Sequence, residues 1–459
     1  MFTLGEIVTL CNGRLIGGET ETRVSGISTD SRTIGRGELF VALKGPHFDG
    51  HRFVGEAHQK GAVCALVGER IETSLPVIVV SDPLRALQDL ARSYRLRFSV
   101  PVVAVTGSVG KTTTKECIAV ALSEVFHVRM GFGNWNNHIG VPMNLFRLSS
   151  RDQCLVLELG ANHPGEIKRL AEIAEPTVGV ITSIYPVHLE GFGSLSKIYQ
   201  AKLELADFLD QTFGTVVADG DDPELVRRLR NRKFSLVTFG ASKNCDYRLS
   251  ELFVGDGVIY FKVNDQFEFR LKGYGAFNAL NALAAVAVSG YFNLDLRSLA
   301  ESWQALPAIQ GRFRMERLET HDIMIVDDSY NANPVSFKQA IQSFVKLTPR
   351  ARRWVVVGDM LELGEHSGIY HEDLGRYLAD FEIDFLAGVG SESKLTLGTF
   401  AKLNREGKTV HFQNSLEAGR FLATALQEGD AVLIKGSHGM HLDQIRPLLI
   451  QSIETATSV

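Results

Sequence analysis

Residues 102–115 combine residue types and a spacing suited to holding phosphate: their sequence is VVAVTGSVGKTTTK. An apolar, β-branched run ends in a glycine-containing loop, and a helical pattern follows. Glycines let backbone N–H groups approach phosphate closely, and a helix N-terminus favours anions. Lys111 would then reach the outer phosphates of ATP or GTP, and Thr112 would place its hydroxyl on Mg²⁺. The candidate phosphate contacts are Gly107, Ser108, Val109, Gly110, Lys111, Thr112 and Thr113.

This segment departs from the full G-x-x-x-x-G-K-[ST] pattern, because Val105 stands at the place of the first glycine. The alternative is a glycine turn that only caps an ordinary helix. The buried-type strand directly before the loop favours the phosphate site.

Further polar side chains follow the next apolar runs, and in an open parallel sheet ligands collect at the carboxyl ends of the strands. Glu158 ends the run CLVLE, and His188 follows the run VGVITSI. A strand-end acid often only caps the next helix, and a lone histidine is more often structural than a ligand. Together with Thr112, however, Glu158 and His188 favour a metal cluster. Lys202 lies on the next helical stretch, where its spacing alone is typical of a solvated lysine.

Two loops are dense in amide side chains. Residues 134–142 (NWNNHIGVP) follow the phosphate-loop helix, and they could either line a substrate groove or form a long turn. Residues 327–334 (DDSYNANP) follow another apolar run, where two acids and two amides favour a binding loop over a plain turn. The candidate substrate contacts from these loops are Asn134, Asn137, Asn331 and Asn333.

Two other positions allow a functional and a structural role. Asn278 and Asn281 begin a helical pattern at 276–291, where N-capping is the alternative. The arginines of the string GRFR, at 311–314, fall at an expected domain junction. They could stabilise developing phosphate charge or only hold an interface.

The composition is that of a globular protein of several domains. A chain of 459 residues is too long for one ordinary core, and about two to four domains are expected. A net charge of −5 gives no electrostatic footprint for nucleic acid or an anionic membrane. The five cysteines are scattered without a C-x-x-C pair, which favours reduced thiols over a disulfide frame or a zinc site. The sequence shows neither a signal peptide nor a membrane span, so a cytoplasmic protein is expected.

The pattern of predicted strands and helices changes twice along the chain. Residues 1 to about 95 carry short strand candidates with many turns, such as GELFVAL and PVIVVSD. From about 96 to 307, apolar runs alternate with helical stretches, which predicts βαβ units around a parallel sheet. An interlude at about 245–272 alternates apolar and polar residues as strands do. From about 308 the βα alternation restarts with IMIVDD, RWVVVGD, FLAGVG and AVLIKGS.

Taken together, these motifs resemble the Mur ligase superfamily of ATP-dependent amide-forming enzymes. TGSVGKTTTK resembles its phosphate loop, and the resemblance covers nearly the whole chain. NWNNHIGVP, ELGANHPGEI, DDSYNANPVS and GDMLELG most resemble the branch that joins D-alanyl-D-alanine to UDP-N-acetylmuramoyl-tripeptide. The branch that adds the third residue tends to carry a Tyr-Ala-His string in place of SYNANP, and an Asp-Asn-Pro-Arg string that is absent here. Folylpolyglutamate synthases lack an N-terminal domain with this chain's DSR (30–32) and G…DGH (45–51) patterns.

The resemblance implies three α/β domains: a small UDP-binding domain at 1–95, a central P-loop domain at 96–307 and a Rossmann-like domain at 308–459. It implies ATP and Mg²⁺, with two ions, as cofactors. UDP-N-acetylmuramoyl-tripeptide and D-Ala-D-Ala are the implied substrates, and the implied process is cytoplasmic synthesis of peptidoglycan precursors. A monomer is expected.

The resemblance also implies residue roles. Ser31, Arg32 and Lys44 would lie near the uridine nucleotide, whereas Asn278, Arg312 and Asp327 would contact ATP. Lys111, His188 and Lys202 would be catalytic. Lys202 would be carbamylated by CO₂ and would hold a second metal ion with His188, while Thr112 and Glu158 serve the first.

One position departs from the superfamily, which usually has His where this chain has Phe277; no His–nucleotide contact is therefore expected there. Two alternatives stay open from the sequence. One is a different amide ligase of the same type, of the Mur or the folylpolyglutamate synthase kind. The other is a P-loop NTPase switch or binding module.

Overall fold

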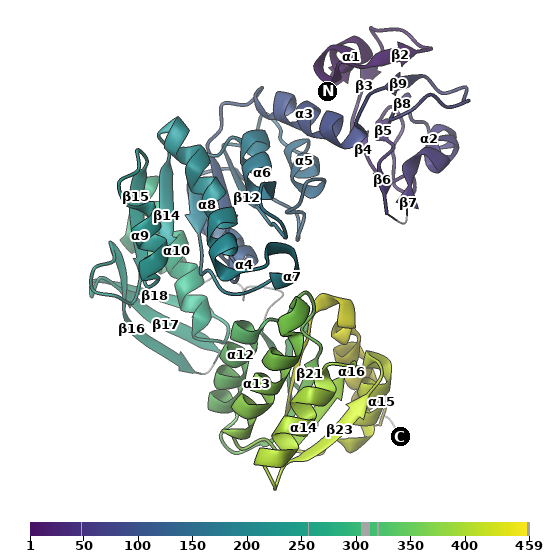
Figure 1. Cartoon of the computed structure of the whole chain (residues 1–459). Coiled ribbons are helices and arrows are strands. Elements are labelled where there is room, and N and C mark those ends of the chain that lie inside the picture. Colours follow the sequence, from purple (N-terminus) through teal and green to yellow (C-terminus); the bar gives the residue numbers. More distant parts are fainter. Residues whose placement is uncertain (47, 256, 304–312, 319–320, 457–459) are drawn as a thin grey trace.

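The computed structural model describes residues 1–459 except 47, 256, 304–312, 319–320 and 457–459. Three α/β domains follow one another along the chain, and their main sheets have five, nine and six strands within the described residues. Figure 1 shows the central domain between the other two, with the N-terminal and C-terminal domains on separate sides of it. Within the described residues, no helix is both long and apolar enough to cross a membrane.

The N-terminal domain is built on a sheet of strand order β2-β9-β8-β5-β4. Its strands are short, as their turn-rich sequence predicts, and the predicted strands in GELFVAL and PVIVVSD are β5 and β9. The elements are β1 (Phe2–Thr3), α1 (Leu4–Cys11), β2 (Arg14–Ile16), β3 (Arg23–Val24), β4 (Ile27–Ser28), β5 (Leu39–Val41), β6 (Lys44–Gly45), β7 (Phe48–Asp49), α2 (Val54–Gln59), β8 (Cys64–Val67), β9 (Val77–Val79) and α3 (Pro83–Arg95).

The central domain has a sheet of order β11-β12-β10-β13-β14-β15-β16-β17-β18. Strands β10 to β16 pair in parallel, whereas β16, β17 and β18, the strands of the alternating interlude, pair antiparallel. The strands are β10 (Val102–Thr106), β11 (Val128–Met130), β12 (Cys154–Glu158), β13 (Val178–Ile181), β14 (Thr215–Asp219), β15 (Ser235–Gly240), β16 (Tyr247–Gly255), β17 (Val258–Val263) and β18 (Phe267–Lys272). The helices are α4 (Lys111–Leu122), α5 (Gly140–Leu145), α6 (Glu166–Ala174), α7 (Leu189–Phe192), α8 (Leu195–Thr212), α9 (Pro223–Leu229), α10 (Phe277–Tyr291) and α11 (Leu296–Trp303).

The C-terminal domain has a sheet of order β19-β20-β24-β21-β22-β23, in which, among the described strands, only β19 runs antiparallel to its neighbour. Its strands β20, β21, β22 and β24 are those that the four apolar runs predict. The elements are β19 (Arg314–Leu318), β20 (Ile323–Asp328), α12 (Pro334–Leu347), β21 (Arg352–Gly358), the 3₁₀ turn η2 (Gly364–His366), α13 (Ser367–Ala379), β22 (Phe385–Val389), α14 (Ser393–Leu403), β23 (Lys408–Phe412), α15 (Ser415–Ala425), β24 (Asp430–Lys435) and α16 (Ile445–Ala456).

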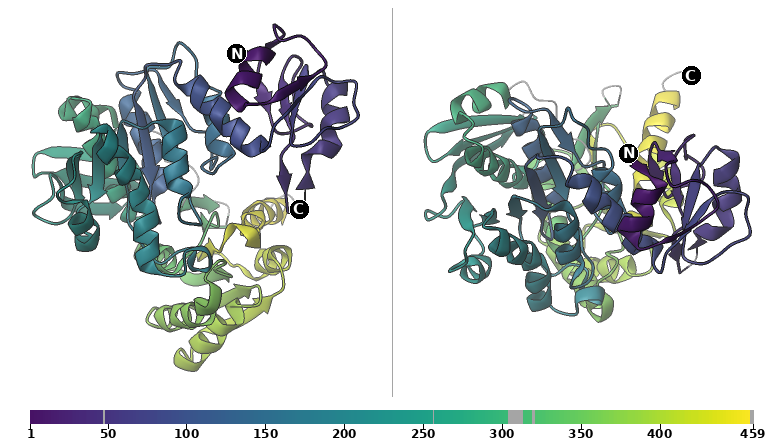
Figure 2. Two further views of the ribbon diagram at one scale, coloured as in Figure 1. Left: turned by 45° about the horizontal axis from the view of Figure 1, so that its top comes forward. Right: turned by 90° about the horizontal axis from the view of Figure 1, so that it is seen from above.

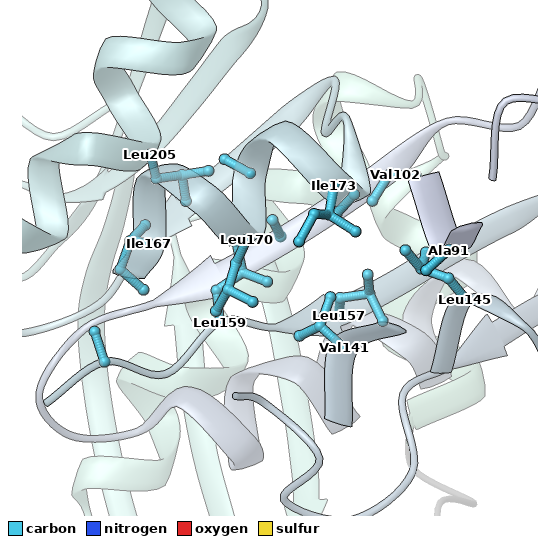
Figure 3. Packing of buried hydrophobic residues seen from close by; sticks show 14 of the residues in the cluster. Ala91, Val102, Val141, Leu145, Leu157, Leu159, Ile167, Leu170, Ile173 and Leu205 are labelled. Atoms are coloured by element: carbon cyan, nitrogen blue, oxygen red, sulfur yellow. The ribbon is translucent and has the colours of Figure 1, made fainter. Parts of the chain in front are cut away.

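Helix α3 joins the N-terminal domain to the central one. Asp82 caps it, Pro83 occupies its first turn, and one face of the helix is apolar. Ala91 on that face belongs to the same buried cluster as Leu145 of α5 and Leu157 of β12 (Figure 3). The turned views of Figure 2 show the N-terminal domain attached to the central domain on the side where α3 lies. The hydrophobic cluster therefore fixes the linker helix on the central domain.

Candidate functional site

A cavity of about 470 Å³ lies between the carboxyl edges of the central and C-terminal sheets. Both edges are switch points of strand order, because β10 lies between β12 and β13, and β24 lies between β20 and β21. Ligands of open α/β sheets bind at such points. The central domain lines the cavity with Ser108, Val109, Gly110, Lys111, Thr113, Asn134, Asn136, Asn137, Glu158, Asn162, Val187, His188, Phe277 and Asn281, and the C-terminal domain with Asp328, Tyr330, Asn331, Asn333, Glu362, Lys435 and Ser437, among others.

The predicted phosphate loop connects the central strand β10 to α4, which begins at Lys111. Gly110 has φ 86° and packs so closely that a Cβ on it would lie 2.3 Å from Asn281 Oδ1. A Cβ on Gly107, with φ 144°, would lie 2.0 Å from Thr182 Oγ1. Only glycine fits at these two positions. Lys111 Nζ donates to the carbonyls of Gly107 (3.0 Å) and Ser108 (3.1 Å), so its ammonium lies on the loop.

Thr112 and Glu158 lie side by side at the ends of neighbouring elements. Thr112 Oγ1 donates to Glu158 Oε2 at 2.7 Å, and Asn136 Nδ2 donates to Glu158 Oε1 at 2.8 Å. Glu158 is 5% exposed, which makes an unpaired carboxylate costly and explains why both oxygens are hydrogen-bonded. The structure thus brings together two of the four predicted metal ligands, which follow or end the neighbouring strands β10 and β12.

Lys202 is buried in α8 and is not on a solvated face, so the prediction from its spacing alone is wrong. It is 1% exposed, its Nζ donates to Ala161 O at 3.3 Å, and it lies 5.3 Å from the ring centre of Phe192. Burial, followed by the nearby charge of Lys111, lowers the pKa of Lys202 to about 7. A substantial fraction of this amine is therefore neutral at neutral pH.

His188 lies at the start of α7 and contacts the C-terminal domain. Its Nδ1 forms an ion-pair contact with Glu362 Oε2, and this hydrogen bond lowers the pKa of Glu362. His188 and Glu158 line the cavity, and Lys202 contacts Ala161, another residue of the lining, without lining the cavity itself. The sequence indicated no partner for His188 from the third domain.

On the opposite wall, the loop after β20 is held by a buried ion pair. Lys435 Nζ contacts Asp328 Oδ2 at 2.6 Å and Asn331 O at 3.0 Å, and Lys435 is 1% exposed. Asp327, the predicted ATP contact, instead accepts from the backbone N–H and the hydroxyl of Ser329 and does not line the cavity. Its contact with ATP stays a prediction, as does that of Arg312, which lies outside the described residues.

Several predicted amides have structural roles in this arrangement. Asn137 Oδ1 accepts from the N–H groups of Ile139 and Gly140, and Asn333 caps α12 by accepting from Ser336 N at 2.8 Å. Asn278 Nδ2 donates to Tyr274 O, and no side-chain bond caps α10. Asn134, Asn137, Asn331 and Asn333 all line the cavity. Substrate contact is therefore open to the remaining polar atoms of these side chains.

The predicted uridine contacts lie in the N-terminal domain, outside the lining of this cavity. Ser31 Oγ donates to Glu56 Oε2 at 2.9 Å. Arg32 is exposed and pairs with Asp30, whose pKa this contact lowers to about 2. Lys44 is exposed in β6. The structure does not test their nucleotide contacts.

Asn281, singled out from the sequence together with Asn278, accepts from Thr114 at 3.3 Å. Three other side chains of the cavity wall were missed from the sequence. Asn136 hydrogen-bonds Glu158, and Glu362 contacts His188. Lys435 pairs with Asp328. Of these, only Lys435 could have been predicted as a site residue from the sequence, because it ends the apolar run of a predicted parallel strand.

The donor set fits Mg²⁺ better than a softer metal. The described residues contain no cluster of three or more His, Cys, Asp or Glu side chains that could hold a metal ion by themselves. Mg²⁺ does not need one, because it is usually bound by one or two carboxylates together with substrate phosphates and water. The adjacent oxygens of Thr112 and Glu158, beside the phosphate loop, supply that protein share.

Comparison with known proteins agrees with the domain order. Residues 23–95 match the family described as Mur ligase family, catalytic domain; residues 105–289 match Mur ligase middle domain; and residues 313–438 match Mur ligase, glutamate ligase domain. A curated relative from Bacillus subtilis, named UDP-N-acetylmuramoyl-tripeptide--D-alanyl-D-alanine ligase, is 33% identical over 98% of both chains.

Solved structures agree over nearly the whole chain. A crystal structure of MurF from Acinetobacter baumannii has a TM-score of 0.88 at 30% identity and covers 98% of this chain and 99% of that one. The MurF ligase from Thermotoga maritima, solved in complex with ADP, has a TM-score of 0.82 at 30% identity, with 95% and 99% covered. The sequence resemblance is confirmed, and this chain belongs to the Mur ligase family.

Proposed function

We propose that this protein is an ATP-dependent amide ligase that joins D-alanyl-D-alanine to UDP-N-acetylmuramoyl-tripeptide in peptidoglycan synthesis. One observation carries the proposal: a phosphate loop with an adjacent Thr112–Glu158 pair faces a second polar loop across a single cavity. The near full-length likeness to ligases of that name supplies the substrates. A P-loop switch would use only the first wall of this cavity and leaves the second unexplained.

The reaction needs ATP because a free carboxylate is a poor electrophile. The terminal carboxylate oxygen of the tripeptide attacks the γ-phosphorus of ATP, which gives an acyl phosphate and ADP. The amine of D-Ala-D-Ala then attacks the acyl carbon. Phosphate leaves from the tetrahedral intermediate, and the ammonium proton is lost to the surroundings. The protein contributes positioning and charge neutralisation.

The central domain supplies the phosphate contacts in this scheme. The backbone N–H groups of residues 107–113 and the ammonium of Lys111 bind the phosphates and neutralise the charge that shifts to ADP. Thr112 and Glu158 would hold Mg²⁺, which when bound neutralises phosphate charge next to the attacking carboxylate. Asn278, Arg312 and Asp327 are the further ATP contacts that we propose.

We assign Lys202 and His188 to a second metal site. The nitrogen of a neutral amine bonds to the carbon of CO₂ and loses a proton to water, which gives a carbamate, and the low pKa of Lys202 favours the neutral amine. The anionic carbamate oxygen suits Mg²⁺, which an ammonium repels. Burial of Lys202 beside Lys111 supports this assignment, because an uncharged or anionic group is more stable there than a second cation.

The outer parts of the substrates are assigned to the remaining domains. Ser31, Arg32 and Lys44 of residues 1–95 would bind the uridine nucleotide, and Asn134, Asn137, Asn331 and Asn333 would contact the peptides. We place the other two domains at 96–307 and 308–459, although the second boundary falls outside the described residues. A monomer working in the cytoplasm, where ATP is available, fits this scheme.

A phosphate-release assay with a panel of amines tests the function. We expect release only when UDP-N-acetylmuramoyl-tripeptide and D-Ala-D-Ala are both present. Equal release with L-lysine, diaminopimelate or glutamate in place of the dipeptide would assign the chain to another ligase of the family. Hydrolysis that is independent of both substrates would favour an NTPase switch.

A further inference from the structure

Two loops from different domains meet at one side of the cavity. On the central side, His188 is the residue before α7, and Figure 1 shows α7 where the central domain approaches the C-terminal domain. On the other side, Glu362 belongs to the loop between β21 and η2. Besides the His188 Nδ1–Glu362 Oε2 contact, Glu190 N donates to Glu362 O at 3.3 Å. A Cβ on Gly364 would lie 3.4 Å from Glu190 Cα, so the loop backbone lies directly against α7.

The Glu362 loop is fixed within its own domain. Leu361 N donates to Ser437 Oγ and Met360 N donates to His371 Nε2, both at 3.0 Å. Leu363 is buried in the core of the C-terminal domain. The position of the Glu362 carboxylate is therefore set by the C-terminal domain and not by the central one.

This contact orients the imidazole more than it stabilises the fold. The side chains of His188 and Glu362 are 26% and 49% exposed, and ion pairs with that exposure contribute little to stability. Because Glu362 occupies Nδ1, the ring presents Nε2 as its other ligand atom. Carboxylates that bind one nitrogen of a histidine in this way fix the ring and raise the basicity of the other nitrogen.

We propose that Glu362 is a positioning residue for the metal site of the central domain. Its carboxylate fixes His188 for metal binding only when the C-terminal domain has docked on α7. The C-terminal domain carries the second wall of the cavity. Its docking is thereby coupled to completion of the metal site in the central domain. The inference rests on the proposed role of His188, and it adds a residue from another domain that acts through it.

Manganese binding followed by electron paramagnetic resonance tests this coupling without turnover, with Mn²⁺ and a non-hydrolysable ATP analogue as probes. We expect Glu362→Ala to weaken nucleotide-dependent Mn²⁺ binding about tenfold and to lower kcat by about 10- to 100-fold. Glu362→Gln keeps an acceptor oxygen for Nδ1–H and recovers part of both losses. Affinity for the analogue without metal stays unchanged. Glu365→Ala, an exposed acid three residues further on, is the matched control and behaves as the wild type.

A His188→Gln background separates positioning from other roles. If Glu362 acts through His188, then adding Glu362→Ala to the His188→Gln variant causes no further loss of Mn²⁺ binding or of kcat. Additive losses in the double variant, or wild-type Mn²⁺ binding by Glu362→Ala, would overturn the proposal. The Mn²⁺-binding measurements use nucleotide and metal alone, so they are independent of the substrate assignment. That assignment fails separately, if the wild-type enzyme does not need D-Ala-D-Ala.

Discussion

At the scale of single residues, the lowered pKa of the buried Lys202 determines whether this side chain can react with CO₂. The charge of Lys111 helps to lower the pKa of Lys202, although burial contributes more. A lysine with an ordinary pKa is almost entirely protonated at neutral pH, and its ammonium form does not react with CO₂. Lys202 has a pKa of about 7, so half of it is neutral at that pH and the neutral fraction grows above it.

We therefore expect Lys202→Ala to be nearly inactive and to be partly rescued by acetate or propionate, whose carboxylate replaces the lost carbamate. The measurement is phosphate release with and without the added acid. Lys197→Ala, a change to an exposed lysine on the same helix, is the control and keeps its rate. Normal activity of Lys202→Ala, or a bare ammonium at Lys202 in a metal-bound crystal structure, contradicts the assignment.

Asp219 gives a pH dependence of stability with a definite sign. Burial raises its pKa from 3.8 to about 6, so the folded state binds more protons than the unfolded state between these values. Stability from this group is therefore present below pH 4 and is lost as the pH rises through 6. Asp219→Asn keeps an oxygen for the N–H of Asp221 and removes the charge. We expect calorimetry to give a higher melting temperature for the variant at pH 8 and no difference near pH 4. A lower melting temperature at pH 8 contradicts this account.

At the scale of elements, Lys115 connects the phosphate-loop helix to the amide-rich loop. This side chain of α4 is 1% exposed, and its Nζ donates to Gly131 O at 3.1 Å and Gly133 O at 2.9 Å. The loop leads directly to Asn134 and Asn136. Lys115 therefore ties the position of α4 to the loop that carries Asn136, which contacts Glu158.

Lys115→Met keeps most of the side-chain volume and removes the ammonium together with both hydrogen bonds. We expect kcat to fall by about tenfold, because the carbonyls of Gly131 and Gly133 lose a charged donor and the loop is displaced. ATP affinity, measured by calorimetric titration, should change less, because the phosphate loop itself is intact. Lys115→Arg retains donors and should recover part of the rate. A Met variant with an unchanged kcat would mean that the loop is held by its other contacts.

The sequence predicted the elements far better than the partners of the side chains. Strand ends were predictable because apolar runs mark buried parallel strands, and this placed Thr112 beside Glu158. Asn137 and Asn333 were predicted as substrate contacts from their residue type, but their side-chain oxygens cap a turn and a helix. In a loop with many polar residues, the sequence does not distinguish a capping amide from one that contacts substrate. Lys202 was misjudged because periodicity does not show which helix face is covered. Glu362 could not be found, because its contact depends on how two domains meet.

At the scale of the molecule, the cavity exists only where the central and C-terminal domains are held together. One contact between the two domains is made by an aromatic side chain. Phe277, at the first turn of α10, packs against the core of the C-terminal domain. Its ring lies 6.0 Å from that of Phe313 at 87°, and it also lines the cavity. The residue that departs from the usual histidine of the superfamily thus serves as a contact between domains.

Phe277→Ala should loosen this attachment without unfolding either domain, because an edge-to-face pair adds only about 0.5–1.5 kcal/mol beyond its buried area. We expect a larger radius of gyration in small-angle scattering and a ligation rate lower by about tenfold, while nucleotide still binds the central domain. Phe292→Ala is the matched control. Phe292 lies at the other end of α10 and contacts Phe126 within the central domain, so its loss should leave the radius unchanged. Unchanged scattering and a full rate for Phe277→Ala would show that the Glu362–His188 contact and the backbone connection suffice to hold the two walls of the cavity together.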